Sequence, residues 1–227
     1  YNAAYSFTYA YTSANSNSYS NSSSMIFVQI AAYRDPELLP TIIDCIKKAK
    51  YPDDLRFGIC WQKHESDKSL ESLSGSNFRV DEVPWHKSLG LCWARSRIQK
   101  MYEGEDFTIQ LDSHHRFAEN WDAKLIEYMS LTGSQKPIIG SYAGVYDPEK
   151  DSELRHEPFK MVGERFTEQG TILFFPHVIQ GWEGLQKPVR ARFVSGHFFF
   201  TIGAHCEEYK YDPNLYFAGD EISLSIR

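Results

Sequence analysis

The sequence predicts an α/β fold in which a mostly parallel central sheet is flanked by helices. Short apolar runs alternate with amphipathic helical segments between residues 25 and 131, a pattern typical of β-α-β units. Turn-forming residues separate these runs, and polar side chains directly follow several of the expected strands. Sheets of this kind bind ligands at the carboxyl ends of their strands, so we expect the functional site there.

The first half of the chain contains the clearest predicted elements. Asp35 is expected to cap a helix whose first residue is Pro36, because a short polar side chain followed by proline favours a helix start. Asn120 is expected to cap a later helix in the same way. The expected strands are residues 26–31, 55–61, 78–83 and 107–111, and the expected helices begin at Pro36, run over 88–101 and follow Asn120.

The second half is richer in loops and aromatic residues, and we expect it to determine specificity. Strand-like runs occupy residues 172–175, 189–194 and 198–202, and a final amphipathic helix begins at Asp220. Because the sequence ends within two turns of that helix, we expect the native chain to continue past Arg227.

Residues 1–24 differ in composition from the rest of the chain. They consist almost wholly of Tyr, Ser, Asn, Ala and Thr, and they contain no charged residue. Such a segment lacks the aliphatic residues that build a core, so it predicts a flexible or loosely docked extension. Residues 25–227 are then expected to form one α/β domain that is incomplete at its C-terminus.

Composition excludes several classes of partner. A net charge of -6 argues against a general nucleic-acid or anionic-membrane surface, because such partners are held by a basic excess. No apolar run approaches the roughly 18 residues of a membrane span, and no secretory signal begins the chain. Cys45, Cys60, Cys92 and Cys206 are widely spaced within apolar segments, which predicts reduced thiols and a cytoplasmic location.

The most informative segment follows the strand expected at residues 107–111. Asp112 and His114 lie two residues apart, and His115 adds a second imidazole. A carboxylate and an imidazole with open positions suit Mn²⁺ or Mg²⁺ bridged to phosphates, whereas a His-rich site suits Zn²⁺. The same residues also suit a strand-ending turn in which Asp112 accepts backbone hydrogen bonds. A metal site and a simple turn are therefore both open from the residues alone.

Basic residues lie near expected strand ends and helix starts, where a diphosphate meets both charge and a helix dipole. No P-loop or dinucleotide motif accompanies them, and each alone is typical of a surface charge. They are Arg34, His86, Lys87, Arg95 and Arg97.

Acidic and aromatic residues mark the second half. Asp220 and Glu221 open the last helix, where acids either complement the helix dipole or face a substrate. Trp182, His197 and the aromatic run at 198–200 offer faces that suit a sugar ring, with core packing as the alternative.

The order of five motifs resembles the GT-A glycosyltransferases that attach α-GlcNAc to protein hydroxyproline, glycosyltransferase family 60. The resemblance covers about residues 25–227, and its order is more specific than any single motif. The polypeptide GalNAc-transferases, which are related to that family, also carry an Asp-Ser-His metal motif. The five motifs are Gln29–Glu37, Gly90–Arg95, Leu111–His114, Ser195–His197 and Phe217–Glu221.

The resemblance implies a GT-A fold and a role for each matched residue. Asp112 and His114 would hold Mn²⁺, or Mg²⁺, on the diphosphate of a UDP-sugar, and Asp220 and Glu221 would be catalytic residues facing the donor sugar or the acceptor. A third metal ligand in the family is a His beyond the helix that starts at Asp220. The residues assigned to the nucleotide are Ala31, Tyr33, Arg34 and Arg95. The acceptor is assigned by residue type, from the faces described above, to Trp182, His197 and Phe198.

The expected function is metal-dependent, retaining transfer of GlcNAc from UDP-GlcNAc to a hydroxyl of a protein or peptide, on hydroxyproline or Ser/Thr. In this family the β-phosphate is described as taking the acceptor proton, so no base residue is required. A second reading is a zinc hydrolase that uses Asp112, His114 and His115 together with His86 or His197. A third is an inactive module that only binds the sugar nucleotide.

Overall fold

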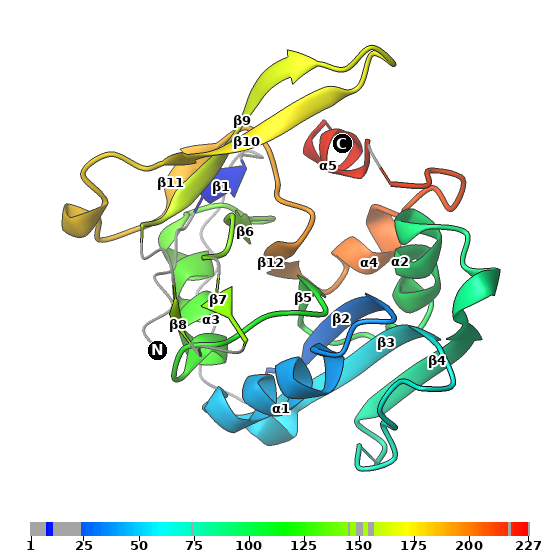
Figure 1. Ribbon diagram of the computed structural model, residues 1–227. Coiled ribbons are helices and arrows are strands. Elements are labelled where there is room, and N and C mark those ends of the chain that lie inside the picture. Colours follow the sequence, from blue (N-terminus) through cyan, green and yellow to red (C-terminus); the bar gives the residue numbers. More distant parts are fainter. Residues whose placement is uncertain are drawn as a thin grey trace.

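The computed structural model describes residues 8–10, 24–73, 75–144, 146–148, 152–153, 157–217 and 219–226 (Figure 1). Its centre is an eight-stranded sheet in the order β11-β1-β6-β12-β5-β2-β3-β4. The strands are β11 (Val189–Ala191), β1 (Thr8–Ala10), β6 (Ile138–Gly140), β12 (Phe198–Ile202), β5 (Phe107–Asp112), β2 (Ile26–Tyr33), β3 (Leu55–Lys63) and β4 (Phe78–Pro84).

Four neighbouring strands, β5, β2, β3 and β4, run parallel, which confirms the predicted α/β class. Beyond them β12 pairs antiparallel with both β5 and β6, so the second half makes the sheet mixed. Two small antiparallel pairs lie outside it: β9 (Phe159–Phe166) with β10 (Ile172–Val178), and β7 (Tyr146–Asp147) with β8 (Ser152–Glu153).

Helices cover both faces of the sheet. The helical elements are α1 (Leu38–Lys48), η1 (Pro52–Asp54), η2 (Trp85–Lys87), α2 (Leu91–Gln99), α3 (Trp121–Leu131), η3 (Trp182–Gly184), α4 (His205–Glu208) and α5 (Asp220–Ser225). Within the described ranges, no helix has the length and apolar character needed to cross a membrane.

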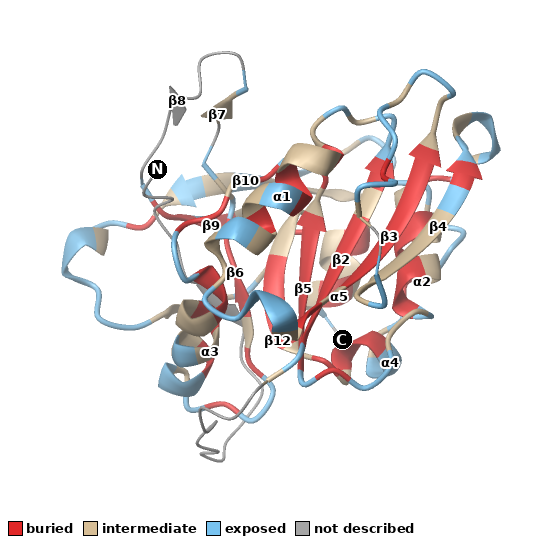
Figure 2. Ribbon diagram, turned by 90° about the horizontal axis from the view of Figure 1, so that it is seen from below, coloured by how far each residue is buried: buried red, intermediate tan, exposed pale blue. Residues whose placement is uncertain are grey.

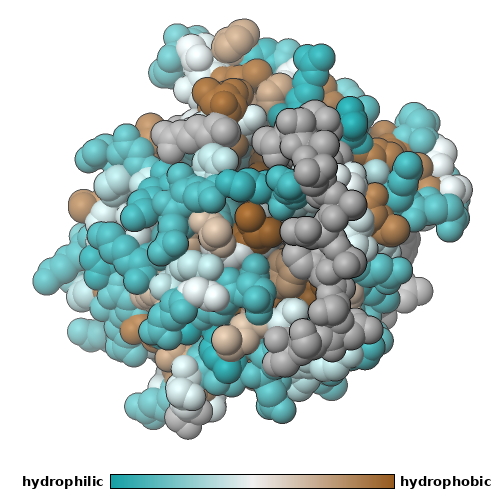
Figure 3. Space-filling view, turned by 180° about the vertical axis from the view of Figure 1, so that it is seen from behind, coloured by the Kyte–Doolittle hydropathy of each residue, from teal (hydrophilic) through white to brown (hydrophobic). Residues whose placement is uncertain are grey.

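Strand β2 shows how alternation along the sequence builds two cores. Ile30 and its same-face neighbours pack into one buried cluster with residues of α1 and α3. Phe27, on the opposite face, packs with Ala94 and Ile98 of α2 and Cys206 of α4. Both layers exclude water from β2, β3 and β5, which are the most buried strands in Figure 2. Seen from behind, hydrophilic side chains cover most of the visible described surface (Figure 3).

Two helix starts differ from the sequence prediction. Asp35 does not cap α1, which begins at Leu38 after a turn; its side chain bonds elsewhere, as described below. Helix α2 begins at Leu91 because Gly90 has a φ of 106° and lies against the Tyr216 backbone, where a side chain has no room. Asn120 does occupy the N-cap position of α3, although its side chain makes no capping bond.

Part of the expected N-terminal extension is described. Thr8–Ala10 forms β1, which lies between β11 and β6; the rest of residues 1–23 lies outside the described residues. The four cysteines are buried and unpaired, in agreement with the predicted free thiols.

Packing between β3 and α2 generates a stability prediction. A Cβ at Gly58 would overlap the buried Phe27 ring and lie 3.0 Å from Ile98. We expect Gly58→Ala to lower the free energy of unfolding by about 1–3 kcal/mol, because the overlap forces a shift in a packed core. Urea denaturation followed by circular dichroism measures this loss. Gly184→Ala is the matched control, since no atom lies within 4 Å of its added Cβ; equal midpoints for the two variants would contradict the prediction.

Candidate active site

The candidate site lies where parallel strands end together. Ala31 of β2 is in register with Asp112 of β5, so the two strands reach the same edge of the sheet. Strand β12 begins at that edge because it is antiparallel to β5, and the Asp112 amide donates to the His197 carbonyl at 3.1 Å. The first, third and fourth resembling motifs therefore converge at one place.

Asp112 and His114 lie side by side at this edge. The Nε2 atom of His114 is 3.9 Å from Oδ2 of Asp112, and their side chains are 57% and 32% exposed. The other imidazole nitrogen, Nδ1, lies 2.7 Å from Oδ2 of Asp35. Because Nδ1 faces a carboxylate acceptor, Nε2 of the neutral imidazole carries the lone pair that faces Asp112.

The carboxylate of Asp35 is the acceptor for three donors. Its Oδ2 also accepts the Ser113 hydroxyl at 2.7 Å, and Oδ1 accepts the Glu37 amide at 2.9 Å. Burial alone raises the pKa of Asp35, but the hydrogen bonds from His114, Ser113 and Glu37 lower it to about 2. The hydrogen bond to Asp35 in turn raises the pKa of His114 above its ordinary value.

The donor set fits a divalent cation. A carboxylate and an imidazole 3.9 Å apart can share one ion whose ligand distances are about 2.1 Å. An imidazole that binds a metal through one nitrogen commonly donates its other N–H to a carboxylate, as His114 does to Asp35. No cluster of three or more His, Cys, Asp and Glu side chains within the described residues could hold a metal.

Arg95 is the buried centre of the site. Its side chain is 3% exposed; Nη1 contacts Asp220 at 2.5 Å, and Nη2 contacts the Gly196 carbonyl at 2.6 Å and Asp112 at 3.4 Å. The guanidinium also lies 5.5 Å from the centre of the Tyr211 ring. Arg95 is thus bonded to three protein acceptors, and its assignment to the nucleotide stays a prediction.

The two acids of α5 are also engaged with the protein. Asp220 is buried against Arg95, and Oε1 of Glu221 accepts the Gly196 amide at 2.8 Å. Burial raises the pKa of Glu221, while the bond from Gly196 opposes that rise. Arg95 therefore links Asp220 to the Asp112 carboxylate, and the loop at Gly196 links Glu221 to the same Arg95.

The remaining imidazoles at this edge are held as neutral groups. His197 uses both ring nitrogens, Nδ1 with the Ser195 hydroxyl at 2.8 Å and Nε2 with the Ala143 amide at 2.9 Å. His115 bonds the Asp112 carbonyl through Nδ1, and its buried Nε2 has no hydrogen-bond partner. Burial lowers the pKa of both rings. Phe198 is half-buried beside them, facing the His115 ring at 6.4 Å.

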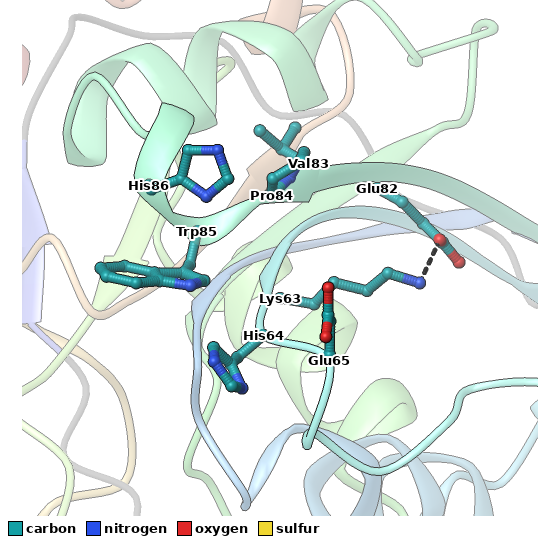
Figure 4. Close-up of a pocket in the computed structure, with 8 residues that line it drawn as sticks. All are labelled: Lys63, His64, Glu65, Glu82, Val83, Pro84, Trp85 and His86. Carbon is teal, nitrogen blue, oxygen red and sulfur yellow. Dashed lines mark hydrogen bonds and ion pairs between the residues drawn. The ribbon is translucent and has the colours of Figure 1, made fainter.

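A hollow of about 530 Å³ opens at the ends of β3 and β4, next to this edge (Figure 4). Trp85 and His64 lie on one side of it, and the ion pair between Lys63 and Glu82 lies on the other. Arg34, which follows β2, lies over the Trp85 ring at 5.1 Å. His86 lines this hollow, whereas Asp112 and His114 are not among its lining residues. Tyr33 is 51% exposed.

Trp182 lies in a different place. It lines a hollow of about 400 Å³ together with Glu127, Tyr128 and Leu131 of α3 and residues that follow η3. No residue of the Asp112 edge lines that hollow. The structure therefore does not bring Trp182 together with His197 and Phe198, the other residues assigned to the acceptor.

Sequence reasoning missed Asp35 and Trp85 as site residues. Asp35 lies two residues beyond the end of β2, and Asp112 ends β5; acids at the ends of neighbouring parallel strands are expected to meet. The sequence shows this placement of Asp35 near a strand end, but Pro36 beside it favoured the interpretation of Asp35 as a helix cap. Trp85 follows β4 in the same way, within a basic segment in which an aromatic residue has no distinctive spacing.

Similarity to known proteins identifies a family for this chain. The chain matches the protein-family model Glycosyltransferase (GlcNAc) over residues 25–75 and 68–227. No curated protein sequence matches it. Among solved structures it resembles a GalNAc-T7 crystal structure with UDP, GalNAc and Mn²⁺, with a TM-score of 0.61 and 18% identity over 89% of this chain and 40% of that one. HddC from Yersinia pseudotuberculosis gives a TM-score of 0.41 and 13% identity over 86% of this chain and 88% of that one.

The likeness to GalNAc-T7 shows the fold, and this chain spans less than half the length of that protein. The family match covers nearly the whole chain from residue 25 onward, including the Asp112 edge and α5. The chain belongs to the Glycosyltransferase (GlcNAc) family.

Proposed function

We propose that this chain is a metal-dependent, retaining glycosyltransferase that moves GlcNAc from UDP-GlcNAc to a hydroxyl of a protein or peptide. The observation that carries the proposal is the paired placement of Asp112 and His114 at the carboxyl end of β5, with Nε2 and Oδ2 3.9 Å apart. The family match supports the reaction and the donor sugar. Hydroxyproline or Ser/Thr as acceptor follows the resemblance of the motifs, and a cytoplasmic location follows the prediction of reduced thiols.

Asp112 and His114 would hold Mn²⁺ or Mg²⁺ together with oxygens of the donor diphosphate. The ion supplies electrostatic stabilisation of the charge that develops on the departing UDP. The residues fit that task, because an imidazole and a carboxylate leave open positions for phosphate oxygens. The likeness to a GalNAc-T7 structure that holds UDP and Mn²⁺ supports the same arrangement.

The nucleoside would lie along the ends of β2, β3 and β4. Neighbouring strands are separated by about 4.8 Å, so the hollow at Trp85 lies on the order of 10–15 Å from Asp112. A nucleoside diphosphate spans such a distance from its base to its β-phosphate. In this arrangement Ala31 and Tyr33 border the ribose, and the uracil stacks in the hollow beside Trp85 and Arg34.

The acceptor hydroxyl would approach from the side of β12 and α5. The neutral rings of His115 and His197 are weak bases, because burial lowers the pKa of each. Proton transfer from the acceptor to the departing phosphate therefore suits the site better than abstraction by a side chain. Asp220 and Glu221 orient this region by holding Arg95 and the Gly196 amide.

The zinc hydrolase reading receives less support. His86 lies in the outer hollow, and both ring nitrogens of His197 are bonded to the protein. A stoichiometric Zn²⁺ in the purified protein, with hydrolysis in the absence of a nucleotide, would favour it over the transferase.

The metal assignment is tested by Asp112→Asn in the full-length protein. We expect GlcNAc transfer and Mn²⁺-dependent binding of UDP-GlcNAc to fall by about 100-fold or more, because one ligand loses its charge. Calorimetry and a radiolabelled transfer assay measure the two effects. The control is Asp106→Asn, which alters an exposed carboxylate that accepts the Met25 amide at the opposite end of β5. If Asp112→Asn and the parent show equal Mn²⁺-dependent binding of UDP-GlcNAc, the metal assignment is wrong.

The pH dependence of metal binding follows from His114. Its pKa is raised above 6.5 by the hydrogen bond to Asp35, so protons compete with the metal already near neutral pH. We expect Mn²⁺ affinity to be greatest above this raised pKa and to fall up to about tenfold per pH unit below it. Electron paramagnetic resonance of free Mn²⁺ follows the change. An affinity that stays flat on acidification from pH 8 to 6 contradicts the assignment of His114.

The outer hollow is tested by Trp85→Ala. Loss of a stacking face is expected to weaken UDP binding about tenfold, since base–aromatic stacking contributes about 1–3 kcal/mol. Calorimetry with UDP and Mn²⁺ provides the measurement. Trp182→Ala is the matched control, because Trp182 lines the separate hollow beside α3. We expect the Trp182→Ala variant and the parent to bind UDP equally well. If Trp85→Ala binds UDP normally, the uracil lies elsewhere.

A further inference from the structure

We propose that Asp35 is a positioning residue that presets His114 for the metal by holding the imidazole nitrogen that does not bind the ion. This inference rests on the proposed function of the Asp112 and His114 pair. It adds a role for a residue in the R-D-P-E segment after β2 that the motif comparison leaves without one.

The contacts of Asp35 exclude a simple surface role. Its side chain is 16% exposed, and one carboxylate oxygen, Oδ2, receives both the His114 Nδ1 and the Ser113 hydroxyl at 2.7 Å. The other oxygen, Oδ1, accepts the Glu37 amide at 2.9 Å. Both ends of the carboxylate are therefore bonded, so Asp35 is placed to orient a ligand and not to be one.

His114 needs this support. Its side chain is 57% exposed, and its ring contact with His115 is a loose one, at 6.3 Å between centroids. An exposed imidazole with little packing samples several rotamers and both neutral tautomers. The bond to Asp35 selects the tautomer with hydrogen on Nδ1, and it directs the free Nε2 lone pair toward Asp112.

Asp35 is itself held by the backbone that precedes it. Arg34 has a φ of 51°, in the left-handed region that non-glycine residues seldom occupy, and its amide bonds the Gln62 carbonyl at 3.0 Å. This turn takes the chain off β2 and points Asp35 toward the loop after β5. The bond to the Glu37 amide then fixes the carboxylate before α1 begins.

The test combines metal affinity with a measurement that needs no metal. Long-range ¹H–¹⁵N spectra of the metal-free protein at alkaline pH report the tautomer of His114 directly. Mn²⁺ affinity in the presence of UDP is measured by electron paramagnetic resonance. The variants are Asp35→Ala, which removes the acceptor, and Asp35→Asn, which keeps one acceptor oxygen and nearly the same volume. Asp122→Asn is the control, because Asp122 is a buried carboxylate that accepts the Lys50 and Tyr51 amides at 2.8 Å.

We expect Asp35→Ala to lose the Nδ1–H tautomer of His114 and to bind Mn²⁺ about 10- to 100-fold more weakly, with a smaller loss in Asp35→Asn. Asp122→Asn should keep the parent tautomer and Mn²⁺ affinity even where it lowers thermal stability. Should Asp35→Ala fail to fold, Asp35→Asn decides the matter through the same two readouts.

Two outcomes overturn the inference, and they are distinguishable. If the parent binds Mn²⁺ and the Asp35 variants bind it equally well, with an unchanged His114 tautomer, only the role of Asp35 is wrong. If the parent binds no Mn²⁺ with or without UDP, the proposed function fails and the inference fails with it.

Discussion

The buried guanidinium of Arg95 is the interaction on which the rest of the site depends. It joins α2 to the end of β5, to the loop before β12 and to α5, through Asp112, the Gly196 carbonyl and Asp220. These segments are distant in the sequence, and a single side chain with a forked donor geometry satisfies all three acceptors at once. Removing one partner of such a buried ion pair lowers the free energy of unfolding by about 3–5 kcal/mol. The contacts of Arg95 therefore hold these segments in place relative to one another.

The same guanidinium also sets the charge that a ligand meets. Arg95 contributes one positive charge between the carboxylates of Asp112 and Asp220, so this group of three carries a net negative charge. In the proposed function, a divalent cation at Asp112 would reverse that sign and attract a diphosphate, whereas a diphosphate alone would be repelled. Metal and sugar nucleotide are therefore expected to bind with positive coupling, each improving the site for the other.

The sequence predicted the parallel half of the sheet well, because β2, β3 and β5 are mostly apolar runs buried on both faces. Asp112 and His114 could be placed at a strand end for the same reason, since they directly follow one of these runs. The protein partners of Arg95 could not be predicted, because the Gly196 carbonyl and Asp220 lie 101 and 125 residues away in the sequence. Trp182 was assigned to the acceptor by its residue type, and only the tertiary structure separates its hollow from the Asp112 edge.

The two side chains proposed to bind the metal are held to different degrees. Asp112 belongs to a central strand and touches the buried Arg95, whereas His114 lies in an exposed loop and depends on Asp35. In the proposed function, Asp112 would supply a ligand fixed by the sheet, and His114 would supply one whose orientation depends on Asp35. Oxygens of the donor diphosphate would complete the coordination of the metal.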